Sequence, residues 1–138
     1  ARLIEADACQ INTWWDQNPY DRILADVPCS ASGIVRRHPD IKWNRTPADI
    51  VSFTKTQAEL LDALWNCLAI GGKLLYATCS IFKKENTDQT ARFLQKHRDA
   101  RLLPLMNLSE KDKQLLPNDQ QDGFYYALFE RNKPSRLP

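Results

Sequence analysis

The sequence predicts an α/β fold built on an open sheet, and three observations lead to this class. Two apolar segments, Arg22 to Ala25 and Leu74 to Ala77, have the length of buried strands. A long stretch with helical spacing of apolar residues lies between them. Each strand segment is followed by a polar turn that contains a cysteine. Because reacting groups in open α/β sheets collect outside the carboxyl ends of strands, we expect both turns to form one site.

Composition places the chain among soluble globular proteins, with 43% hydrophobic and 26% charged residues in 138 positions. This length is typical of one domain with a real core. The formal net charge of +2 is too small to indicate a nucleic-acid partner, so such a partner must be argued from local clusters. No apolar run approaches membrane-spanning length, and no secretory signal opens the sequence. We therefore expect no membrane partner.

The four cysteines occupy positions 9, 29, 67 and 79. No two of them form a C-x-x-C pair, and neither histidine has ligand-like spacing to any of them. We therefore expect no metal site. A disulfide framework is also not expected in a chain with this much core-forming material, which points to a reducing cytoplasm.

The first part of the chain contains two strand candidates, each followed by an acid. The run Arg2 to Ala6 predicts a short opening strand that ends at Asp7, whose ordinary role would be that of a solvated carboxylate. Tyr20 to Ala25 predicts the next strand. Asp26 follows it, and an aspartate in this place commonly caps the following turn. Pro28 then fixes the backbone of that turn.

The segment Ile34 to Arg45 is predicted to be a loop that carries cations and an indole. The residues concerned are Arg36, Arg37, Lys42, Trp43 and Arg45. Cations suit phosphates, and planar groups suit unpaired bases. An ordinary solvated loop is the alternative. Because this loop directly follows a candidate catalytic turn, we favour contact with RNA.

A long helix is predicted to begin after Thr46. Thr46 can cap it, Pro47 suits its first position, and Asp49 sits where a carboxylate can reach back to the cap. The apolar spacing extends to residue 69 or 70, and Gly71 with Gly72 is predicted to end the helix there.

The remainder of the chain predicts one more helix and two strands. Asn86 is a candidate cap for the helix, and His97 near its end is expected to interact with the last carbonyls. Arg101 to Leu105 is a short strand candidate, and Met106 to Asp122 is predicted to be a long loop. Phe124 to Phe129 is apolar on both alternating faces, which predicts an interior strand.

These motifs carry a family resemblance. Asp26-Val27-Pro28-Cys29 together with Thr78-Cys79-Ser80 resembles the paired motifs of the RNA 5-methylcytosine methyltransferases. The longer runs Pro28 to Trp43 and Tyr76 to Ser80, followed by Glu85-Asn86, are similar to the Sun/RsmB branch, which acts on small-subunit ribosomal RNA. Either motif alone would be weak evidence. Both motifs on strand ends, with a helix between them, are specific.

The resemblance implies a Rossmann-like fold that depends on S-adenosyl-L-methionine, of which this chain is the carboxyl-terminal half. None of the four glycines lies in a G-x-G pattern after an opening strand, as a main cofactor loop requires. We therefore expect the first strands to be missing and residues 1–138 to form the carboxyl-terminal portion of one catalytic domain. Such a fragment should be inactive alone. Its opening segment should be displaced or paired with a second copy, and its exposed sheet edge should favour self-association.

The resemblance also assigns roles to individual residues. Cys79 would attack carbon 6 of a cytosine as a thiolate, which activates carbon 5 for methylation. Cys29 would assist removal of the carbon 5 proton and release of the product. Asp26 would hydrogen-bond the base and lie near the methyl donor, with Asp7 and Pro28 as further cofactor-binding residues.

A reading from a different class is a non-catalytic RNA-binding or ribosome-assembly module that keeps the fold and retains the cysteines as relics. The presence of Asp26, Cys29 and Cys79 together favours the enzyme. The predicted partner in both cases is ribosomal RNA.

Overall fold

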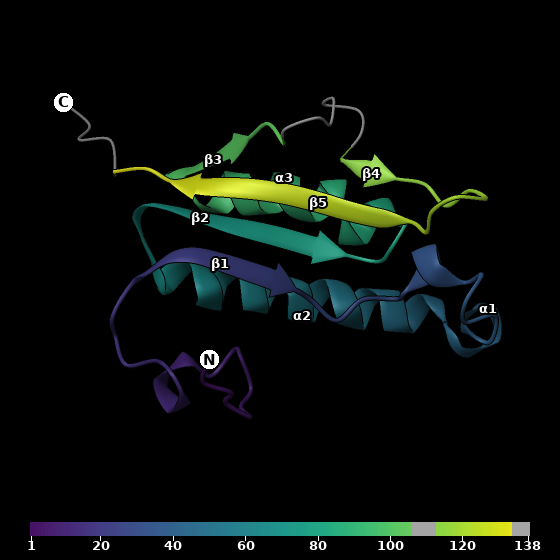
Figure 1. The fold of residues 1–138 in the computed structure, drawn as a ribbon, viewed down its shortest axis with the longest axis horizontal. Helices are drawn as coiled ribbons and strands as arrows, with labels where there is room; N and C mark the ends of the chain where they lie inside the picture. Colours follow the sequence, from purple (N-terminus) through teal and green to yellow (C-terminus); the bar gives the residue numbers. More distant parts are fainter. Residues whose placement is uncertain (106–112, 134–138) are drawn as a thin grey trace.

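The computed structural model describes residues 1–105 and 113–133 and contains one mixed β-sheet (Figure 1). Its strands are β1 (Tyr20–Asp26), β2 (Leu68–Thr78), β3 (Ala100–Leu103), β4 (Gln114–Leu115) and β5 (Phe124–Arg131). The strand order is β1-β2-β5-β3, and β4 also pairs with β5. Strands β1 and β2 are parallel, whereas β5 runs antiparallel to β2, β3 and β4. The predicted α/β class is therefore confirmed.

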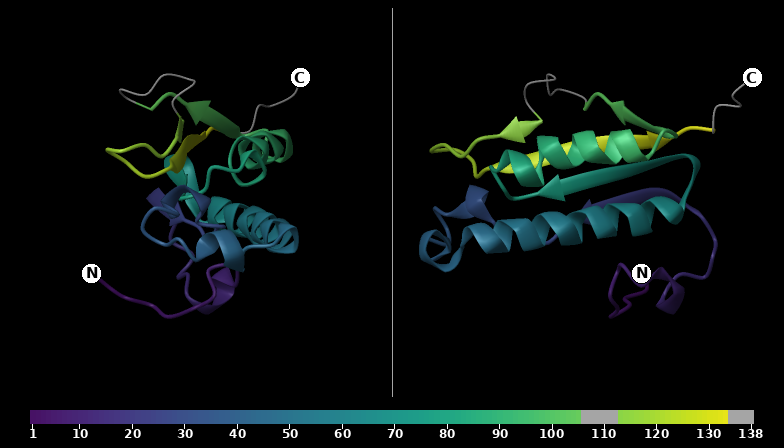
Figure 2. Two further views of the ribbon diagram at one scale, coloured as in Figure 1. Left: turned by 90° about the vertical axis from the view of Figure 1, so that its right-hand side faces the viewer. Right: turned by 180° about the vertical axis from the view of Figure 1, so that it is seen from behind.

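The helices are α1 (Ile41–Asn44), α2 (Pro47–Asn66) and α3 (Thr87–Lys96). Figure 2 shows that α2 and α3 cover the same face of the sheet. Short 3-10 turns occupy Ile11–Thr13, Ser32–Ile34 and Lys83–Glu85. None of the helices among the described residues combines the length and the apolar character that a bilayer crossing requires.

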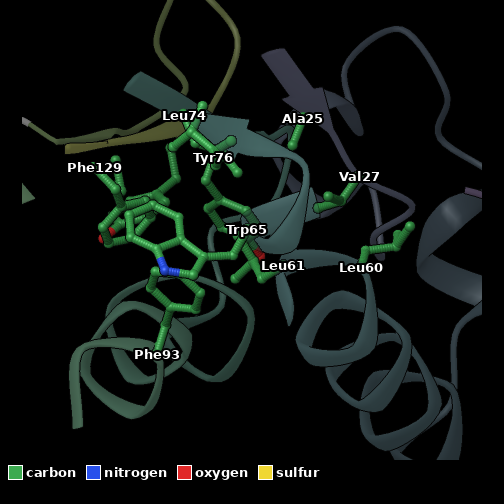
Figure 3. Packing of buried hydrophobic residues seen from close by; sticks show 12 residues of the cluster. Ala25, Val27, Leu60, Leu61, Trp65, Leu74, Tyr76, Phe93 and Phe129 are labelled. Atoms are coloured by element: carbon green, nitrogen blue, oxygen red, sulfur yellow. The ribbon is translucent and has the colours of Figure 1, made fainter. Parts of the chain in front are cut away.

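The core lies between the sheet and these two helices (Figure 3). Trp65 of α2 meets Phe93 of α3 edge to face, with ring centroids 5.1 Å apart, and Phe93 lies 4.7 Å from the ring of Phe129 on β5. Leu74 and Tyr76 of β2 are fully buried in the same cluster. This packing holds β2 and β1 in place, so it also fixes where their carboxyl ends lie.

The predicted start of the long helix is confirmed. The backbone N–H of Asp49 donates to Thr46 Oγ1 at 3.3 Å, and the N–H of Thr46 donates to Asp49 Oδ2 at 2.8 Å. Pro47 occupies the first helical position. The backbone N–H groups of Thr46 and Asp49 thereby each gain a side-chain acceptor, as the spacing of these residues predicts.

The predicted end of that helix is wrong. Helix α2 stops at Asn66, and both Gly71 and Gly72 lie inside β2. Gly71 has a φ of +81°, a conformation that favours glycine. The register between β1 and β2 shifts between Tyr20 and Arg22, opposite this part of β2. The glycines therefore allow a bend within a strand, a role that a sequence pattern does not separate from helix termination.

The predicted opening strand, Arg2 to Ala6, is also wrong. These residues form no strand and are exposed. The segment lies beyond β1 and α2 in Figures 1 and 2. A strand needs a neighbour for its backbone groups, and this segment does not pair with the outer edge of β1. The expected displacement of the segment agrees with this arrangement.

Two loop predictions need correction, and two strand predictions are confirmed. The predicted loop Ile34 to Arg45 contains the one-turn helix α1. The predicted loop Met106 to Asp122 contains the short strand β4, while residues 106–112 lie outside the described residues. The strand predicted over Arg101 to Leu105 is present as β3, and β5 is an interior strand between β2 and β3.

The two predicted helix-end contacts of α3 are wrong. Asn86 makes no side-chain cap bond, because its Oδ1 accepts from Thr78 Oγ1 at 2.7 Å and its Nδ2 donates to the carbonyl of Ser80 at 2.8 Å. His97 Nε2 lies 2.7 Å from Asp62 Oδ1 on α2. Both side chains therefore serve tertiary contacts that local sequence does not reveal.

Candidate active site

The two cysteine turns meet at the carboxyl ends of β1 and β2. These strands are parallel neighbours, and Asp26 pairs in register with Ala77. The two chain segments that follow bring Cys29 Sγ and Cys79 Sγ to 3.5 Å. The structure therefore places the two predicted turns in one site, as the ends of adjacent parallel strands require.

Backbone contacts hold the first turn against its surroundings. The N–H of Gly33 donates to the carbonyl of Cys79 at 2.8 Å, and the N–H of Gly123 donates to the carbonyl of Gly33 at 2.8 Å. A Cβ atom at Gly33 would collide with the carbonyl of Gly123. Glycine at this position thus permits the close approach that joins the first turn, the second turn and the segment before β5.

The paired sulfurs have different acidities. The hydrogen bond from Cys29 lowers the pKa of Cys79 to about 7, against the opposing effects of burial and of the charges on Asp26 and Glu85. The same hydrogen bond, together with burial, raises the pKa of Cys29. Near neutral pH the arrangement therefore favours a thiolate at Cys79 and a thiol at Cys29. A thiolate is the nucleophilic form of cysteine.

Cys79 opens onto a pocket of about 360 Å³. Its lining comprises Leu24, Asp26, Ile34, Arg37, Ala77, Thr78, Cys79, Phe124 and Tyr126. The rings of Phe124 and Tyr126 stack with their centroids 6.2 Å apart. The pocket combines a nucleophile, a carboxylate, a guanidinium and flat apolar surface, a combination that suits a planar polar ligand.

The predicted cofactor residues do not all reach this pocket. Asp26 lies exposed on its wall. Asp7 lies outside the pocket and caps its own turn, because Oδ1 accepts from the N–H of Cys9 at 2.9 Å and Oδ2 accepts from Gln10 Nε2 at 3.1 Å. Pro28 is exposed, and its carbonyl accepts from Gln57 Nε2 at 2.9 Å.

A buried carboxylate, Glu85, lies at the cysteine turns; it belongs to the family motif quoted above, but no site role was predicted for it. Glu85 is 0% exposed. Its Oε1 accepts from the N–H of Ser30 at 2.9 Å and from Gln57 Nε2 at 3.1 Å. Its Oε2 accepts from Ser30 Oγ at 2.6 Å and from Ser80 Oγ at 2.5 Å. The available signal was the repeated Cys-Ser dipeptide, since each serine directly follows one of the two cysteines.

The predicted RNA-binding residues differ in their surroundings. Arg37 Nε lies 2.6 Å from Asp122 Oδ2, and Arg36 Nη2 lies 3.4 Å from Oδ1 of the same carboxylate. Lys42 and Trp43 are exposed, and Trp43 retains 85% of its accessible surface. These residues therefore divide into a pair bound to an acid and a pair open to solvent.

Arg45 lies next to a second hollow. Its Nε donates to the carbonyl of Ser30 at 3.1 Å, and its guanidinium lies 5.4 Å from the ring centroid of Phe53. The hollow has a volume of about 460 Å³ and is lined by Arg45, Thr46, Pro47, Ile50, Phe82, Lys83 and Lys84. Phe82, Lys83 and Lys84 are not among the predicted site residues, although they lie shortly after the second cysteine turn.

A family model described as 16S rRNA methyltransferase RsmB/F matches residues 1–130 of the chain. The chain belongs to the RsmB/F family. The predicted resemblance to the Sun/RsmB branch is therefore confirmed.

Curated relatives support the same assignment. The chain is 46% identical over 132 residues to the ribosomal RNA small subunit methyltransferase B of Vibrio cholerae, which covers 95% of this chain and 30% of the relative. It is 47% identical over 141 residues to the protein of the same name from Pseudomonas putida, covering 99% of this chain and 32% of the relative. The chain thus spans about a third of the length of these curated relatives.

Solved structures share the fold. The crystal structure of PH0851 superimposes with a TM-score of 0.84 at 32% identity and covers 91% of this chain and 30% of that one. The structure of NSun6 from Pyrococcus horikoshii with SFG has a TM-score of 0.81 at 24% identity and covers 96% and 35%, respectively. The predicted Rossmann-like methyltransferase fold of this RsmB/F family chain is therefore confirmed.

We also looked for side chains that could bind a metal ion within residues 1–105 and 113–133. No group of three His, Cys, Asp or Glu side chains in these ranges has an arrangement that could hold a metal ion.

Proposed function

We propose that residues 1–138 form the carboxyl-terminal portion of a single catalytic domain of an RNA 5-methylcytosine methyltransferase. The reaction would transfer a methyl group from S-adenosyl-L-methionine to carbon 5 of a cytosine in small-subunit ribosomal RNA. The observation that carries the proposal is the contact between Cys29 Sγ and Cys79 Sγ at 3.5 Å, beside a pocket that also contains Asp26. Membership of the RsmB/F family and the names of the curated relatives support it.

The chemistry begins at Cys79. Carbon 5 of cytosine is a poor nucleophile, and addition of a thiolate to carbon 6 moves electron density to carbon 5. The pKa of Cys79 near 7 supplies the thiolate at neutral pH. Asp26, on the wall of the same pocket, is placed to accept a hydrogen bond from the polar edge of the base.

Cys29 acts in the second half of the reaction. While Cys79 is a thiolate, its hydrogen bond with Cys29 raises the pKa of Cys29. Once the Cys79 sulfur is bonded to carbon, it no longer carries the charge that opposes ionisation of Cys29. Cys29 can then lose its proton to solvent, and the resulting thiolate takes the proton from carbon 5. The electrons of that C–H bond restore the C5–C6 double bond and expel the Cys79 thiolate from carbon 6. The pair thereby divides nucleophile and base between two sulfurs.

The fit of this chain to the methyl donor is partial. S-adenosyl-L-methionine, when bound, supplies an electrophilic methyl group. Asp26 and the pocket beside it are suited to one side of such a ligand, whereas Asp7 caps its own turn elsewhere and Pro28 binds Gln57 through its carbonyl. The structure of NSun6 with SFG, an analogue of the donor, supports donor binding by the fold. We propose that the isolated chain binds the donor weakly and is inactive alone.

The exposed cations and the indole are proposed to contact the RNA. Lys42 and Trp43 are open to solvent, and Arg36, Arg37 and Arg45 lie on segments that flank the cysteine pocket. Cations pair with phosphates, and an exposed indole stacks on an unpaired base. With ribosomal RNA as the proposed substrate, we propose that the protein acts in the cytoplasm, where a reducing environment would keep both thiols free.

The decisive experiment uses a chimera in which this chain replaces the matching segment of the Vibrio cholerae relative. The chimera is incubated with S-adenosyl-L-methionine and small-subunit ribosomal RNA that contains 5-fluorocytosine. Fluorine at carbon 5 blocks release, so the covalent protein–RNA adduct should accumulate and survive denaturation. We expect the adduct to vanish in Cys79→Ala and to persist in Cys29→Ala, with Cys67→Ala as the matched cysteine control.

The alternative predicts a different result in the same assay. A non-catalytic RNA-binding or ribosome-assembly module would bind the RNA and the donor without forming an adduct. An adduct that persists in Cys79→Ala would instead contradict the assigned nucleophile while leaving the reaction class intact.

A further inference from the structure

We propose that Glu85 is a positioning residue whose buried carboxylate locks the turns of Cys29 and Cys79 together, a role that rests on the proposed cysteine chemistry. Glu85 lies on the 3-10 turn Lys83–Glu85, which follows the second cysteine turn. It touches neither sulfur through a hydrogen bond that the structure describes. It acts instead through the two serines that follow the cysteines.

The geometry places the carboxylate at the junction of three segments. Ser30, next to Cys29, donates both its N–H and its Oγ to Glu85, at 2.9 Å and 2.6 Å. Ser80, next to Cys79, donates its Oγ at 2.5 Å. Gln57 of α2 donates its Nε2 at 3.1 Å. A single side chain thus joins both cysteine turns to the long helix.

A carboxylate suits this junction better than any amide. Four donors converge on the two oxygens of Glu85, and an ionised carboxylate offers acceptor sites only. A glutamine would turn an NH₂ group toward some of these donors and leave them unpaired. Burial of a charge costs free energy unless hydrogen bonds compensate, and these four bonds supply that compensation.

The surrounding bonds make the junction rigid. Tyr76 of β2 donates its hydroxyl to the Glu85 carbonyl at 2.6 Å, which fixes the backbone of the turn. Ser80 Oγ also accepts from the N–H of Phe82 at 3.0 Å. The carboxylate therefore cannot swing away without breaking contacts to the strand that ends at the nucleophile.

Positioning and simple electrostatics predict opposite effects on Cys79. The charged and titratable groups around its sulfur are Cys29, Asp26, Glu85 and Arg37. The hydrogen bond from Cys29 lowers the pKa of Cys79, whereas the negative charge of Glu85 raises it. Removal of the Glu85 charge alone would make Cys79 more acidic. Loss of the alignment between the two sulfurs would make Cys79 less acidic.

The test is the pH dependence of Cys79 alkylation in Glu85→Gln. The 138-residue chain is treated with iodoacetamide from pH 5 to pH 10, and peptide mass spectrometry follows Cys79 separately from the other cysteines. We expect the alkylation midpoint to rise, with the rate at pH 6 falling roughly tenfold for each pKa unit. A midpoint that falls or stays the same would overturn the proposal.

A second variant keeps the proposal testable if Glu85→Gln fails to fold. The double variant Ser30→Ala with Ser80→Ala retains the carboxylate charge and removes the two hydroxyl bonds among its four, while the backbone N–H of residue 30 and Gln57 Nε2 can still donate. We expect the Cys79 midpoint to rise in this variant too, and an unchanged midpoint there would contradict the positioning role. Glu59→Gln, an exposed glutamate of α2, is the matched control and should leave the midpoint unchanged. The assay needs neither RNA nor methyl donor, so its failure is distinguishable from failure of the proposed reaction.

Discussion

Two regions of the sheet differ in how fully this chain forms them. The cysteine turns at the carboxyl ends of β1 and β2 are held together by residues of the chain, whereas the outer edge of β1 has no paired strand among the described residues. At the carboxyl ends, the two cysteine turns are joined by Glu85 and by the backbone bond from Gly33 to Cys79. At the outer edge of β1, Leu24 is 69% exposed. No strand among the described residues pairs with that edge.

This difference shows that the cysteine site can form while one edge of the sheet remains unpaired. The cysteine pair depends on the register of β1 with β2 and on packing of α2 and α3, all of which lie within residues 1–138. The edge of β1 depends on groups that pair with its free backbone donors and acceptors. The chain spans about a third of its curated relatives, and we propose that further parts of such a protein cover this edge.

The largest expected effect separates the core, represented by Leu61 of α2, from the free edge of β1. Leu61 is 1% exposed in the core, so Leu61→Ala should lower the free energy of unfolding by about 2–5 kcal/mol through lost burial and a cavity. Leu24→Ala, the same change at the exposed edge, should stay within about 0.5 kcal/mol. Urea denaturation followed by circular dichroism measures both. Equal losses would contradict the comparison.

An intermediate effect is expected within the cysteine pair. Cys29→Ala removes the hydrogen bond that lowers the pKa of Cys79 to about 7, so the pKa should rise toward the ordinary value of 9.0. The thiolate fraction at pH 7, and with it the alkylation rate of Cys79, should fall by about tenfold or more. The sign is fixed because burial and the nearby carboxylates also raise this pKa. Cys67→Ala serves as the control, and a rate that is unchanged in Cys29→Ala would refute the contact.

The smallest effect concerns self-association through the edge of β1. An unpaired strand edge with an exposed leucine favours pairing with a second copy, and a lysine at such an edge opposes it. Leu24→Lys should therefore lower the weight-average mass in sedimentation at high protein concentration, with little change in folding stability. The matched control is Ile70→Lys, at another exposed apolar position on β2. A strict monomer in the unsubstituted chain would contradict the prediction of self-association.

The sequence by itself determined the elements whose signals are local. The start of α2 is predicted by Thr46, Pro47 and Asp49, because a capping box involves only neighbours along the chain. Apolar runs likewise predicted β1, the end of β2, β3 and β5. Two cysteines after two parallel strands predicted a single site, since strand order and direction bring such ends together.

Only the tertiary structure decided the roles that depend on distant partners. Glu85 stands in the family motif without a predicted role, and only the fold shows that it is buried where donors from Ser30, Gln57 and Ser80 converge on it. Gly71 lies in a bent strand rather than at a helix end, and Asn86 and His97 bind across the fold. Arg2 to Ala6 forms no strand, because backbone pairing needs a neighbour that apolar spacing cannot provide. The spacing of apolar residues along the sequence indicates which of them become buried. Whether a polar group is buried with them depends on hydrogen-bond partners that are distant in sequence, and only the tertiary structure shows these.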